Sequence, residues 1–444
     1  MSGSKIFELG SQSVEITMGG TCTGFNLNNL RDCAISSADL SSLFLGTTRA
    51  PTEASIKGQS NIAIGYSALK NNTAIGNIAI GYGALETGVS GNFNTGIGYQ
   101  SLENNTIGDH NTGIGYQSLQ NNTRGLQNTG IGYQSLVNNT TGNYNIGIGY
   151  QSLQNNTDAD NNIGIGNTSL KENTSGNYNI GIGSNALKEN TNGDNNTGIG
   201  YQSLQSNTRG DQNTTVGAQS LVFNTTGNQN TVTGAGVLKN NITGSHNTAF
   251  GTSVLKNSVG LSFNTAFGDN TFPSLTVGQY NTAIGACAGT ILTNGTNITL
   301  VGAGAQPSTA SRTSNEITLG NASITSLRCA DTTIASLSDG RDKTNIQDSN
   351  YGLSFVSQLR PVQFEWKRRI LVPGDENHPK NGKNRLGFIA QDLQEAMPNG
   401  ENEIIDLVYE SNPERLEVKQ GNLIPIMVKA IQDLTKRVQI LENK

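Results

Sequence analysis

Polar and apolar residues recur in a fixed order along most of this chain, with a period of about 17 residues. Successive units begin at Asn61, Asn77 and Asn94 and continue to Asn297; of the fourteen intervals, twelve are 17 residues and two are 16. A typical unit reads NTGIGYQSLxNNTxGxx. Such a constant register indicates that each unit is one coil of a stacked β-solenoid. Glycine recurs too often inside every candidate helix for a helical repeat.

Within one unit, Ile97 and Leu102 are the dependable large apolar positions. Gly96 and Gly98 flank the isoleucine, where another backbone is expected to come close. The NNT-G segment, residues 104–108, is expected to form a turn with positive φ at Asn and Gly. Because identical positions stack from coil to coil, we expect Asn and Thr to form hydrogen-bonded ladders.

The interior of such a coil is thin, because each unit offers only one or two large apolar side chains. A lone chain would bury too little apolar surface to offset its ordering entropy. Three chains around a common axis would bury a second face of each coil, so the sequence predicts a homotrimer. Fifteen coils at about 4.8 Å each would form a rod of roughly 70 Å.

The pattern divides the chain into four segments. Residues 1–60 lack the repeat and are expected to form a cap or an attachment segment. Residues 61–302 form the predicted shaft, and residues 303–337 a β-rich neck in which the period loosens. The last segment, residues 338–444, holds 15 of the 28 Lys and Arg and 16 of the 33 Asp and Glu, which marks a domain boundary.

The last segment has mixed α and β patterns. Helix-like runs occur at 351–359 and 387–397, a strand-like run at 361–366 ends at Trp366, and a loop is expected at 378–384. Residues 423–443 are expected to form a helix. Five of its apolar residues are spaced 4, 3, 4 and 3 apart, as in a coiled coil: Met427, Ile431, Leu434, Val438 and Leu441. An amphipathic helix that packs on its own domain would show similar spacing, but the predicted trimer favours a three-stranded bundle.

Charge and composition exclude several classes of protein. The formal net charge is −5, so no basic field favours nucleic acid. No run of 18 apolar residues predicts a membrane span, and the N-terminus lacks the apolar run of a secretory signal. Sequons such as Asn104-Asn105-Thr106 are therefore expected to stay unglycosylated and to serve the structure.

Cysteine and histidine give no metal-binding spacing, and we expect no metal and no cofactor. The cysteines are interpreted as reduced, partly buried thiols, with a Cys22–Cys33 disulfide as the alternative; the other two are Cys287 and Cys329. His110 and His246 occupy the same position of two units, which indicates a surface slot. The alternative is that a threefold axis gathers such histidines around an ion.

Candidate chemistry lies at the start of the charged segment. Ser338 and Lys343 are five residues apart in a Gly-containing loop, close enough to meet across a turn. A serine becomes nucleophilic when a base accepts its proton, and a lysine serves as that base only if burial or a nearby cation lowers its pKa. Arg341 could contribute that cation. From these residues alone, an ordinary polar turn is the favoured interpretation.

The repeat resembles a known fibre module. NIAIGYSAL and NTGIGYQSL resemble the AIGxxA coil of trimeric autotransporter adhesin heads, a left-handed β-roll, although the unit here is longer. Similar 17-residue units occur in phage and large-virus fibre proteins. The resemblance implies a trimeric β-structured rod, first of all a spacer or shaft, and it implies no particular ligand.

The charged segment resembles a second family. SDGRDKTNI, LRPVQFEWK, GFIAQDLQE and LIPIMVKAIQDLTKRVQILE occur in the order found in the intramolecular chaperone of endosialidase-type tail spikes, and the domain is similar to the self-cleaving module of the myelin regulatory factor family. The resemblance implies an α+β domain that trimerises, guides folding of the rod and cuts itself off. It places Ser338 as nucleophile, Lys343 as general base and the scissile bond at Leu337–Ser338. Asp339 and Arg341, on the same turn, are candidate supporting residues.

Together these features predict a mainly β homotrimeric fibre or spike of a virion, assembled in the host cytoplasm. Its N-terminus would bind a virion or tail attachment protein, and its rod a host receptor or glycan. The chaperone would be an autoproteolytic serine peptidase without turnover. One alternative is a glycan depolymerase, although no carboxylate pair is fixed in the repeat. Another is a cellular surface adhesin, against which the missing signal and anchor argue.

Overall fold

The structure is a computed structural model of the 444-residue chain. It describes residues 5–9, 12–16, 33–35, 43–45, 59–88, 90–324, 326–328, 338–365, 384–397, 405–410 and 416–444. The chain divides into two compact units, residues 1–230 and 231–444. Within the described ranges, no helix is long and apolar enough to cross a bilayer.

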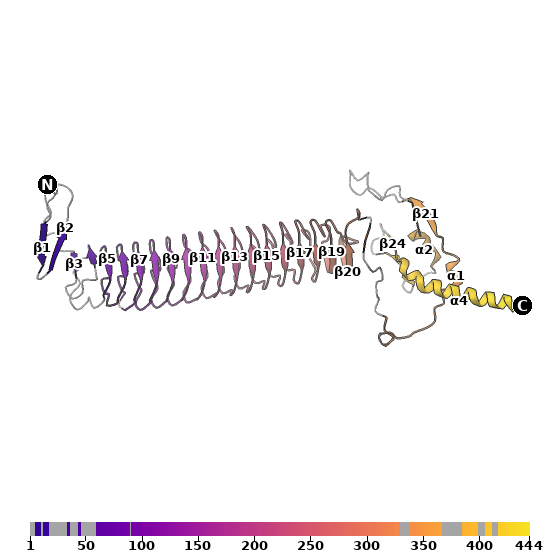
Figure 1. Cartoon of the computed structure of the whole chain (residues 1–444), viewed down its shortest axis with the longest axis horizontal. Coiled ribbons are helices and arrows are strands. Elements are labelled where there is room, and N and C mark those ends of the chain that lie inside the picture. The colour runs from indigo at the N-terminus through magenta and orange to yellow at the C-terminus, as the bar shows by residue number, and fades with distance from the viewer. Residues whose placement is uncertain are drawn as a thin grey trace. The chain divides into compact units, whose positions relative to one another are not determined.

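The first unit is a stack of β-coils preceded by two short antiparallel pairs. These pairs are β1 (Lys5–Leu9) with β2 (Gln12–Ile16), and β3 (Cys33–Ile35) with β4 (Leu43–Leu45). The coil strands are β5 (Ile62–Ile64), β6 (Ile78–Ile80), β7 (Thr95–Ile97), β8 (Thr112–Ile114), β9 (Thr129–Ile131), β10 (Ile146–Ile148), β11 (Ile163–Ile165), β12 (Ile180–Ile182), β13 (Thr197–Ile199) and β14 (Thr214–Val216). Each pairs in parallel with the next, so equivalent residues are neighbours (Figure 1). The predicted β-solenoid of 17-residue coils is confirmed.

Each coil encloses a narrow interior built around one leucine. In β7 the middle residue, Gly96, points inward and is buried, whereas Thr95 and Ile97 are half-buried on the outer side. Leu102 is fully buried. A Cβ added to Gly113 of the next coil would lie 2.7 Å from the Ser101 Oγ atom and 3.1 Å from the Leu102 Cγ atom, so the packing of this coil favours glycine opposite the leucine.

The left-handed residues of the coil lie elsewhere than the sequence predicts. Positive φ occurs at Gly98 (132°), Gln100 (53°) and Leu102 (53°), and not within residues 104–108. The segment 104–108 does turn and bend, so only the positive φ expected in it is wrong. The left-handed conformation costs a leucine roughly 1–2 kcal/mol. Full burial of its side chain, worth about 1.5–3 kcal/mol, offsets that cost. At Gly98 an added Cβ would lie 2.4 Å from the Gly115 carbonyl oxygen, which confirms the predicted close backbone approach.

Two internal ladders of buried asparagines join the coils. The Asn94 Oδ1 atom accepts from the Asn111 backbone N–H at 2.8 Å, and the Asn111 Nδ2 atom donates to the Gly125 carbonyl at 2.8 Å. In the second ladder the Asn122 Nδ2 atom donates to Asn105 Oδ1 at 2.8 Å. These asparagines are fully buried, and such groups are costly unless they are hydrogen-bonded. The predicted ladders are therefore confirmed, and they occupy the interior.

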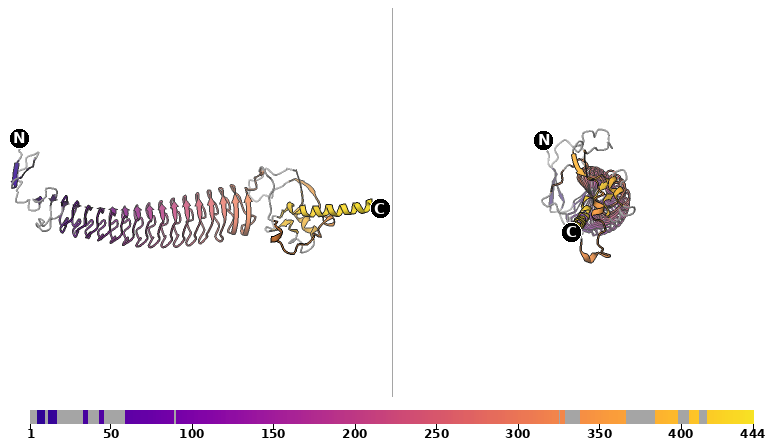
Figure 2. Two further views of the ribbon diagram at one scale, coloured as in Figure 1. Left: turned by 60° about the horizontal axis from the view of Figure 1, so that its bottom comes forward. Right: turned by 90° about the vertical axis from the view of Figure 1, so that its right-hand side faces the viewer.

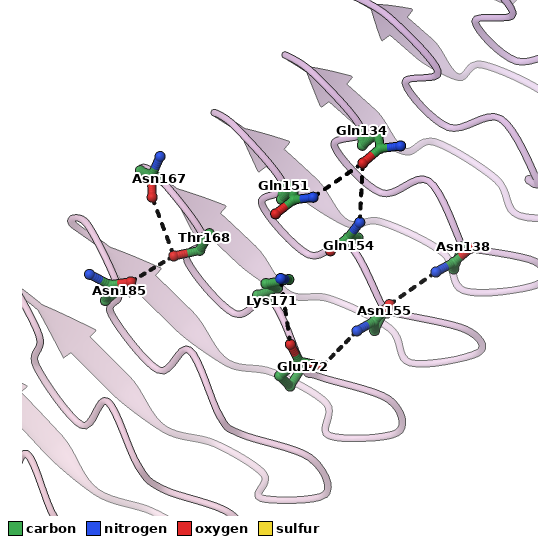
Figure 3. A network of polar contacts seen from close by, with 10 residues as sticks. All are labelled: Gln134, Asn138, Gln151, Gln154, Asn155, Asn167, Thr168, Lys171, Glu172 and Asn185. Atoms are coloured by element: carbon green, nitrogen blue, oxygen red, sulfur yellow. Dashed lines mark hydrogen bonds and ion pairs between the residues drawn. The ribbon is translucent and has the colours of Figure 1, made fainter.

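Further ladders run along the outside of the coils. Gln151 donates to Gln134 at 3.2 Å, and Asn138 donates to Asn155 at 3.0 Å. The Asn155 amide then donates to the Glu172 carboxylate at 2.6 Å (Figure 3). The sequon residues take part in the same way, because Asn104 donates to Asn121 and the Thr106 hydroxyl donates to the Thr123 carbonyl.

The second unit begins with coil strands of the same kind. Its strands are β15 (Thr231–Thr233), β16 (Thr248–Phe250), β17 (Thr265–Phe267), β18 (Thr282–Ile284), β19 (Asn294–Val301) and β20 (Ser311–Leu319), seen from another side in Figure 2. The unit predicted to begin at Asn297 begins one residue later: Thr282 pairs with Thr299, and Ile298 fills the place of the ladder asparagine. The ladder ends there because isoleucine has no amide to continue it. β20 lies in the predicted neck and pairs in parallel with β19.

The charged segment forms a small α+β domain, as predicted. Its elements are the 3-10 turn η2 (Gly340–Asp342), α1 (Leu353–Val356), the antiparallel pair β21 (Val362–Glu365) and β22 (Asn384–Gly387), α2 (Ala390–Ala396), the pair β23 (Val408–Tyr409) and β24 (Glu417–Val418), η3 (Gln420–Asn422) and α4 (Leu423–Glu442). Its core consists of Phe355, Ala390, Leu393, Met397, Ile405, Leu407, Val408, Leu423 and Ile426. Trp366, Leu337, most of the loop at 378–384, Cys22 and Cys329 lie outside the described residues.

Helix α4 has two apolar stripes with different surroundings. Leu423, Ile426 and Ala430 are buried against the domain. The five residues at coiled-coil spacing are 43–69% exposed: Met427, Ile431, Leu434, Val438 and Leu441. The helix therefore packs on its own domain through one stripe and leaves the other stripe uncovered.

Candidate functional site

The segment 338–343 is a tight turn held by its own backbone. Asp339 caps η2, because its Oδ1 atom accepts from the Arg341 N–H at 2.9 Å. The Asp342 N–H donates to the Asp339 carbonyl at 3.2 Å, and the Lys343 N–H donates to the Gly340 carbonyl at 3.3 Å. The chain thereby reverses direction between its first and last residues.

This reversal brings the two predicted catalytic side chains together. The Lys343 Nζ atom donates to the Ser338 Oγ atom at 2.5 Å. This contact is within the distance at which a base takes a proton from a hydroxyl. The structure thus places the two groups as the sequence predicts; their catalytic roles remain predictions.

Asp339 and Arg341 form an ion pair on the same turn. The Arg341 Nε atom lies 3.1 and 3.0 Å from the two carboxylate oxygens of Asp339, and its Nη2 atom lies 2.5 Å from Oδ2. The side-chain and backbone hydrogen bonds from Arg341 lower the pKa of Asp339. The Asp339 carboxylate raises the pKa of Arg341 in return. The charge of Arg341 is therefore balanced by Asp339. The sequence predicts a cation that lowers the pKa of the lysine, and Arg341 is not free to be that cation.

The turn leaves its reactive groups open to water. Residues 338–343 are all exposed, and the glycine in the turn has no atom within 4 Å of the place of a Cβ. Three backbone N–H groups, those of Arg341, Asp342 and Lys343, are already hydrogen-bonded within the turn. They are therefore unsuited to stabilise an oxyanion, and donors for it must come from elsewhere.

Two aspartates of the shaft, Asp109 and Asp160, have structural hydrogen-bond partners. Asp109 accepts from the Asn92 backbone N–H at 2.6 Å, and Asp160 accepts from that of Asn143 at 2.6 Å. Each of these two aspartates caps the coil before it. Within the described part of the chain, no group of three or more His, Cys, Asp or Glu side chains could hold a metal ion.

Other singled-out residues have plain surroundings. His110 stacks on Phe93 and His246 on Phe263, with ring centroids 5.1 and 4.6 Å apart. Both histidines are exposed, as expected for a surface slot. Cys287 is an exposed free thiol, so the partly buried position expected for it is wrong.

Comparison with known proteins identifies the domain that begins at this turn. Residues 338–400 match the family model described as chaperone of endosialidase. Neither the curated proteins nor the solved structures contain a match to this chain. The match begins at Ser338 and ends before β23, so α4 lies outside it. The chain thus combines a β-solenoid shaft with a chaperone-of-endosialidase domain, a combination consistent with a tail-fibre-like protein.

Proposed function

We propose that this chain is the subunit of a homotrimeric fibre or spike whose last domain is an intramolecular chaperone that releases itself. The domain would cut the chain between Leu337 and Ser338, with Ser338 as nucleophile and Lys343 as general base. The observation that carries the proposal is that the family match and the Ser338–Lys343 contact begin at the same residue. The family match starts at the same serine whose hydroxyl accepts a hydrogen bond from Lys343.

A single self-cleavage follows from the position of the serine. The Ser338 hydroxyl attacks the Leu337 carbonyl carbon while the neutral Lys343 amine accepts the hydroxyl proton. The C–N bond then breaks, the proton passes to the leaving amine of Ser338, and an ester joins Leu337 to the serine oxygen. Water hydrolyses the ester to a Leu337 carboxylate and a free Ser338. No site is regenerated, so no turnover is expected.

Assembly would switch this reaction on. A lysine becomes a base when burial or neighbours disfavour its charged form, and in the single chain Ser338 and Lys343 are both exposed. The uncovered stripe of α4 offers a surface for association of three domains. Cleavage that requires the assembled state would release only shafts whose copies have already been brought together.

A chaperone of this kind suits the shaft that precedes it. Contacts between copies close only after long segments have been ordered, which makes folding slow. Early association of the C-terminal domains would raise the effective concentration of the three shafts. We place the finished fibre on a virion, attached through its N-terminal segment and contacting a host receptor or glycan. The support is the combination of shaft and chaperone domain.

Expression of the full chain tests the proposal. We expect two fragments, residues 1–337 and 338–444, with the masses measured by mass spectrometry, and a trimeric larger fragment by light scattering. Ser338→Ala and Lys343→Ala should each leave the chain intact. Ser354→Ala, which changes an exposed serine of α1, is the matched control and should be cleaved normally. Cleavage in the Ser338→Ala chain would refute the dyad, and a monomeric product would refute the fibre.

A further inference from the structure

The outer side of the coil strands in the first unit has an unusual composition. In every strand from β7 to β14 the first and third residues lie on the outer side, because the middle residue points inward. The first is Thr or Ile, and the third is Ile in all but the last strand, which has Val216. These side chains are half-buried by neighbouring coils through β13 and exposed in β14.

A ladder of tyrosines runs along the coils, with one tyrosine two residues after each strand from β5 to β10. Six stacked rings have centroids 5.1–5.2 Å apart: Tyr66, Tyr82, Tyr99, Tyr116, Tyr133 and Tyr150. Their side chains are 43–49% exposed. Neighbouring rings cover the faces, so the edges are what the ladder offers to a partner. A sugar ring that stacks on an aromatic face would find these faces occupied.

We define the outer strip as the first and third strand residues from β7 to β14 together with the position two residues later. Residues 93–218 contain twelve charged side chains, and none of them lies on the outer strip. Eight coils at about 4.8 Å each make the strip about 40 Å long. A continuous uncharged strip of this length on a water-exposed surface marks an interface.

The composition of the outer strip changes in a compensating way. At β11 and β12 the tyrosine position holds Asn167 and Ser184, and in both coils the first strand residue is Ile instead of Thr. Ile163 and Ile180 thus add apolar surface where the tyrosine is missing. The same exchange begins at β10, which has Ile146 as well as a tyrosine. The apolar character of the strip is therefore maintained from β7 to β13, and it decreases at β14, where Ala218 takes the tyrosine position and the first strand residue is Thr214.

The occupant of the outer strip must match its repeat. The strip presents similar groups once per coil, at the spacing of parallel strands. A globular partner has no surface that repeats at this interval over eight coils. A second copy of the same unit repeats the same residues at the same spacing, so each of its coils can contact one coil of the first. No charge has to be desolvated on either side.

We infer that the outer strip is the surface through which the shafts of neighbouring copies pack against one another. The inference rests on the proposed homotrimer and adds to it the residues of the contact. It also accounts for the two apolar positions of each unit. Leu102 fills the coil of its own chain, and Ile97 on the outer side is available to a neighbour.

Photocross-linking in the full-length protein tests this inference. In one variant a benzophenone amino acid replaces Ile131 on the outer strip. In the matched control it replaces Ile107, which is 51% exposed and lies between β7 and β8, away from the outer strip. We expect the yield of covalent dimers and trimers to be at least tenfold higher from position 131. If light scattering shows a trimer but position 131 cross-links no better than position 107, the outer strip is not the interface and the proposed homotrimer stands. A monomeric mass would refute both.

A charge-insertion variant gives a second measurement. The double change Ile131→Lys and Ile148→Lys places charges on the outer strip and leaves the internal leucines unchanged. We expect the shaft to lose its trimeric mass while circular dichroism still reports β-structure, and we expect Ile107→Lys to stay trimeric. A double variant with the mass and melting temperature of the wild type would overturn the inference.

Discussion

At the scale of single residues, the feature that shapes the candidate site is the carboxylate of Asp339. It caps η2 and pairs with Arg341, and the turn that it closes brings Ser338 to Lys343. Among the described residues, the hydrogen bonds of the Asp339 side chain go to Arg341 and not to Ser338 or Lys343. Asp339 is therefore a positioning residue, and its two interactions can be separated by substitution.

We predict that Asp339→Ala slows self-cleavage about tenfold or more and that Asp339→Asn retains most of the rate. Asparagine can still accept from the Arg341 N–H as a helix cap, whereas alanine cannot. The measurement is the rate of appearance of the fragment 338–444 in freshly refolded protein. Equal rates for the two variants would show that the cap does not position the dyad.

The ion pair gives this cap a defined pH dependence. Because Arg341 lowers the folded-state pKa of Asp339, the carboxylate favours the folded turn above its ordinary pKa, and that contribution is lost as pH falls through the depressed folded value. In an uncleaved Ser338→Ala chain, we predict by ¹³C NMR that the pKa of Asp339 lies below the ordinary aspartate value of 3.8. Arg341→Gln should return the midpoint toward that value. A midpoint that does not respond to Arg341→Gln would contradict the pair.

The sequence could predict the members of this site but not their electrostatics. Ser338 and Lys343 stand out because nucleophile and base types lie five residues apart beside a glycine. Arg341 was expected to act as a cation on the lysine, and the structure shows it bound to Asp339. Sequence spacing says which groups are near, whereas the choice of partner depends on side-chain directions that only the folded turn defines.

At the scale of the coil, the buried asparagine ladder is the main polar support. The Asn128 Oδ1 atom accepts from the Asn145 N–H at 2.9 Å, and its Nδ2 atom donates to the Gly142 carbonyl at 2.7 Å. Asn138, in the same coil, is half-buried and belongs to the outer amide ladder. The two asparagines therefore form an internal comparison.

We predict that Asn128→Ala destabilises the shaft by about 2–6 kcal/mol per chain, because two buried groups lose their partner at about 1–3 kcal/mol each. Asn138→Ala should cost well under 1 kcal/mol, because water can replace its bonds. The measurement is the rate of unfolding in guanidinium chloride, followed by circular dichroism. Similar rates for the two variants would show that the inner ladder does not hold the coils together.

The repeat predicts the coil length and the hydrogen-bonded ladders. It does not predict which of the two apolar residues of a unit lies in the interior. From the first coil to β13 both positions are constant, with Ile in the place of Ile97 and Leu in the place of Leu102, and there the strand alternation around Gly96 separates them. The positive φ of Leu102 could not be predicted either, because leucine seldom adopts it alone. Stacking against identical coils buries the leucine side chain and so offsets the strain. The sequence of a single unit does not reveal this burial, because the neighbouring coils provide it.

Helix α4 provides the second prediction at this scale. Its exposed stripe includes Leu434, which is 50% exposed, whereas the neighbouring Gln432 is exposed outside the stripe. In the Ser338→Ala background we predict that Leu434→Glu raises the concentration needed for association at least tenfold, because three buried carboxylates would repel one another. Gln432→Glu should associate normally. Sedimentation analysis measures both, and normal association of Leu434→Glu would show that this stripe does not join the copies.

At the scale of the whole molecule, the shaft and the chaperone domain impose different demands. The shaft is a regular structure in which every coil can pair in a wrong register with an identical one, because the residues repeat almost unchanged. The chaperone domain has its own core and a non-repeating sequence, so copies that associate through it would do so in one register. In the proposed homotrimer, the domain would thus set the stagger of the shafts before their coils pair.

If the chaperone domain sets the stagger of the shafts, the finished shaft should refold poorly once the domain has been removed. We expect cleaved wild-type shaft, unfolded in guanidinium chloride and diluted, to recover its trimeric mass at least tenfold less than the uncleaved Ser338→Ala chain. The reason is kinetic: without the domain, the copies meet at bulk concentration and in any stagger. Adding the separated fragment 338–444 to the cleaved shaft should not restore the yield, because the covalent link supplies the effective concentration. Equal recovery of the two proteins would show that the shaft assembles without the chaperone.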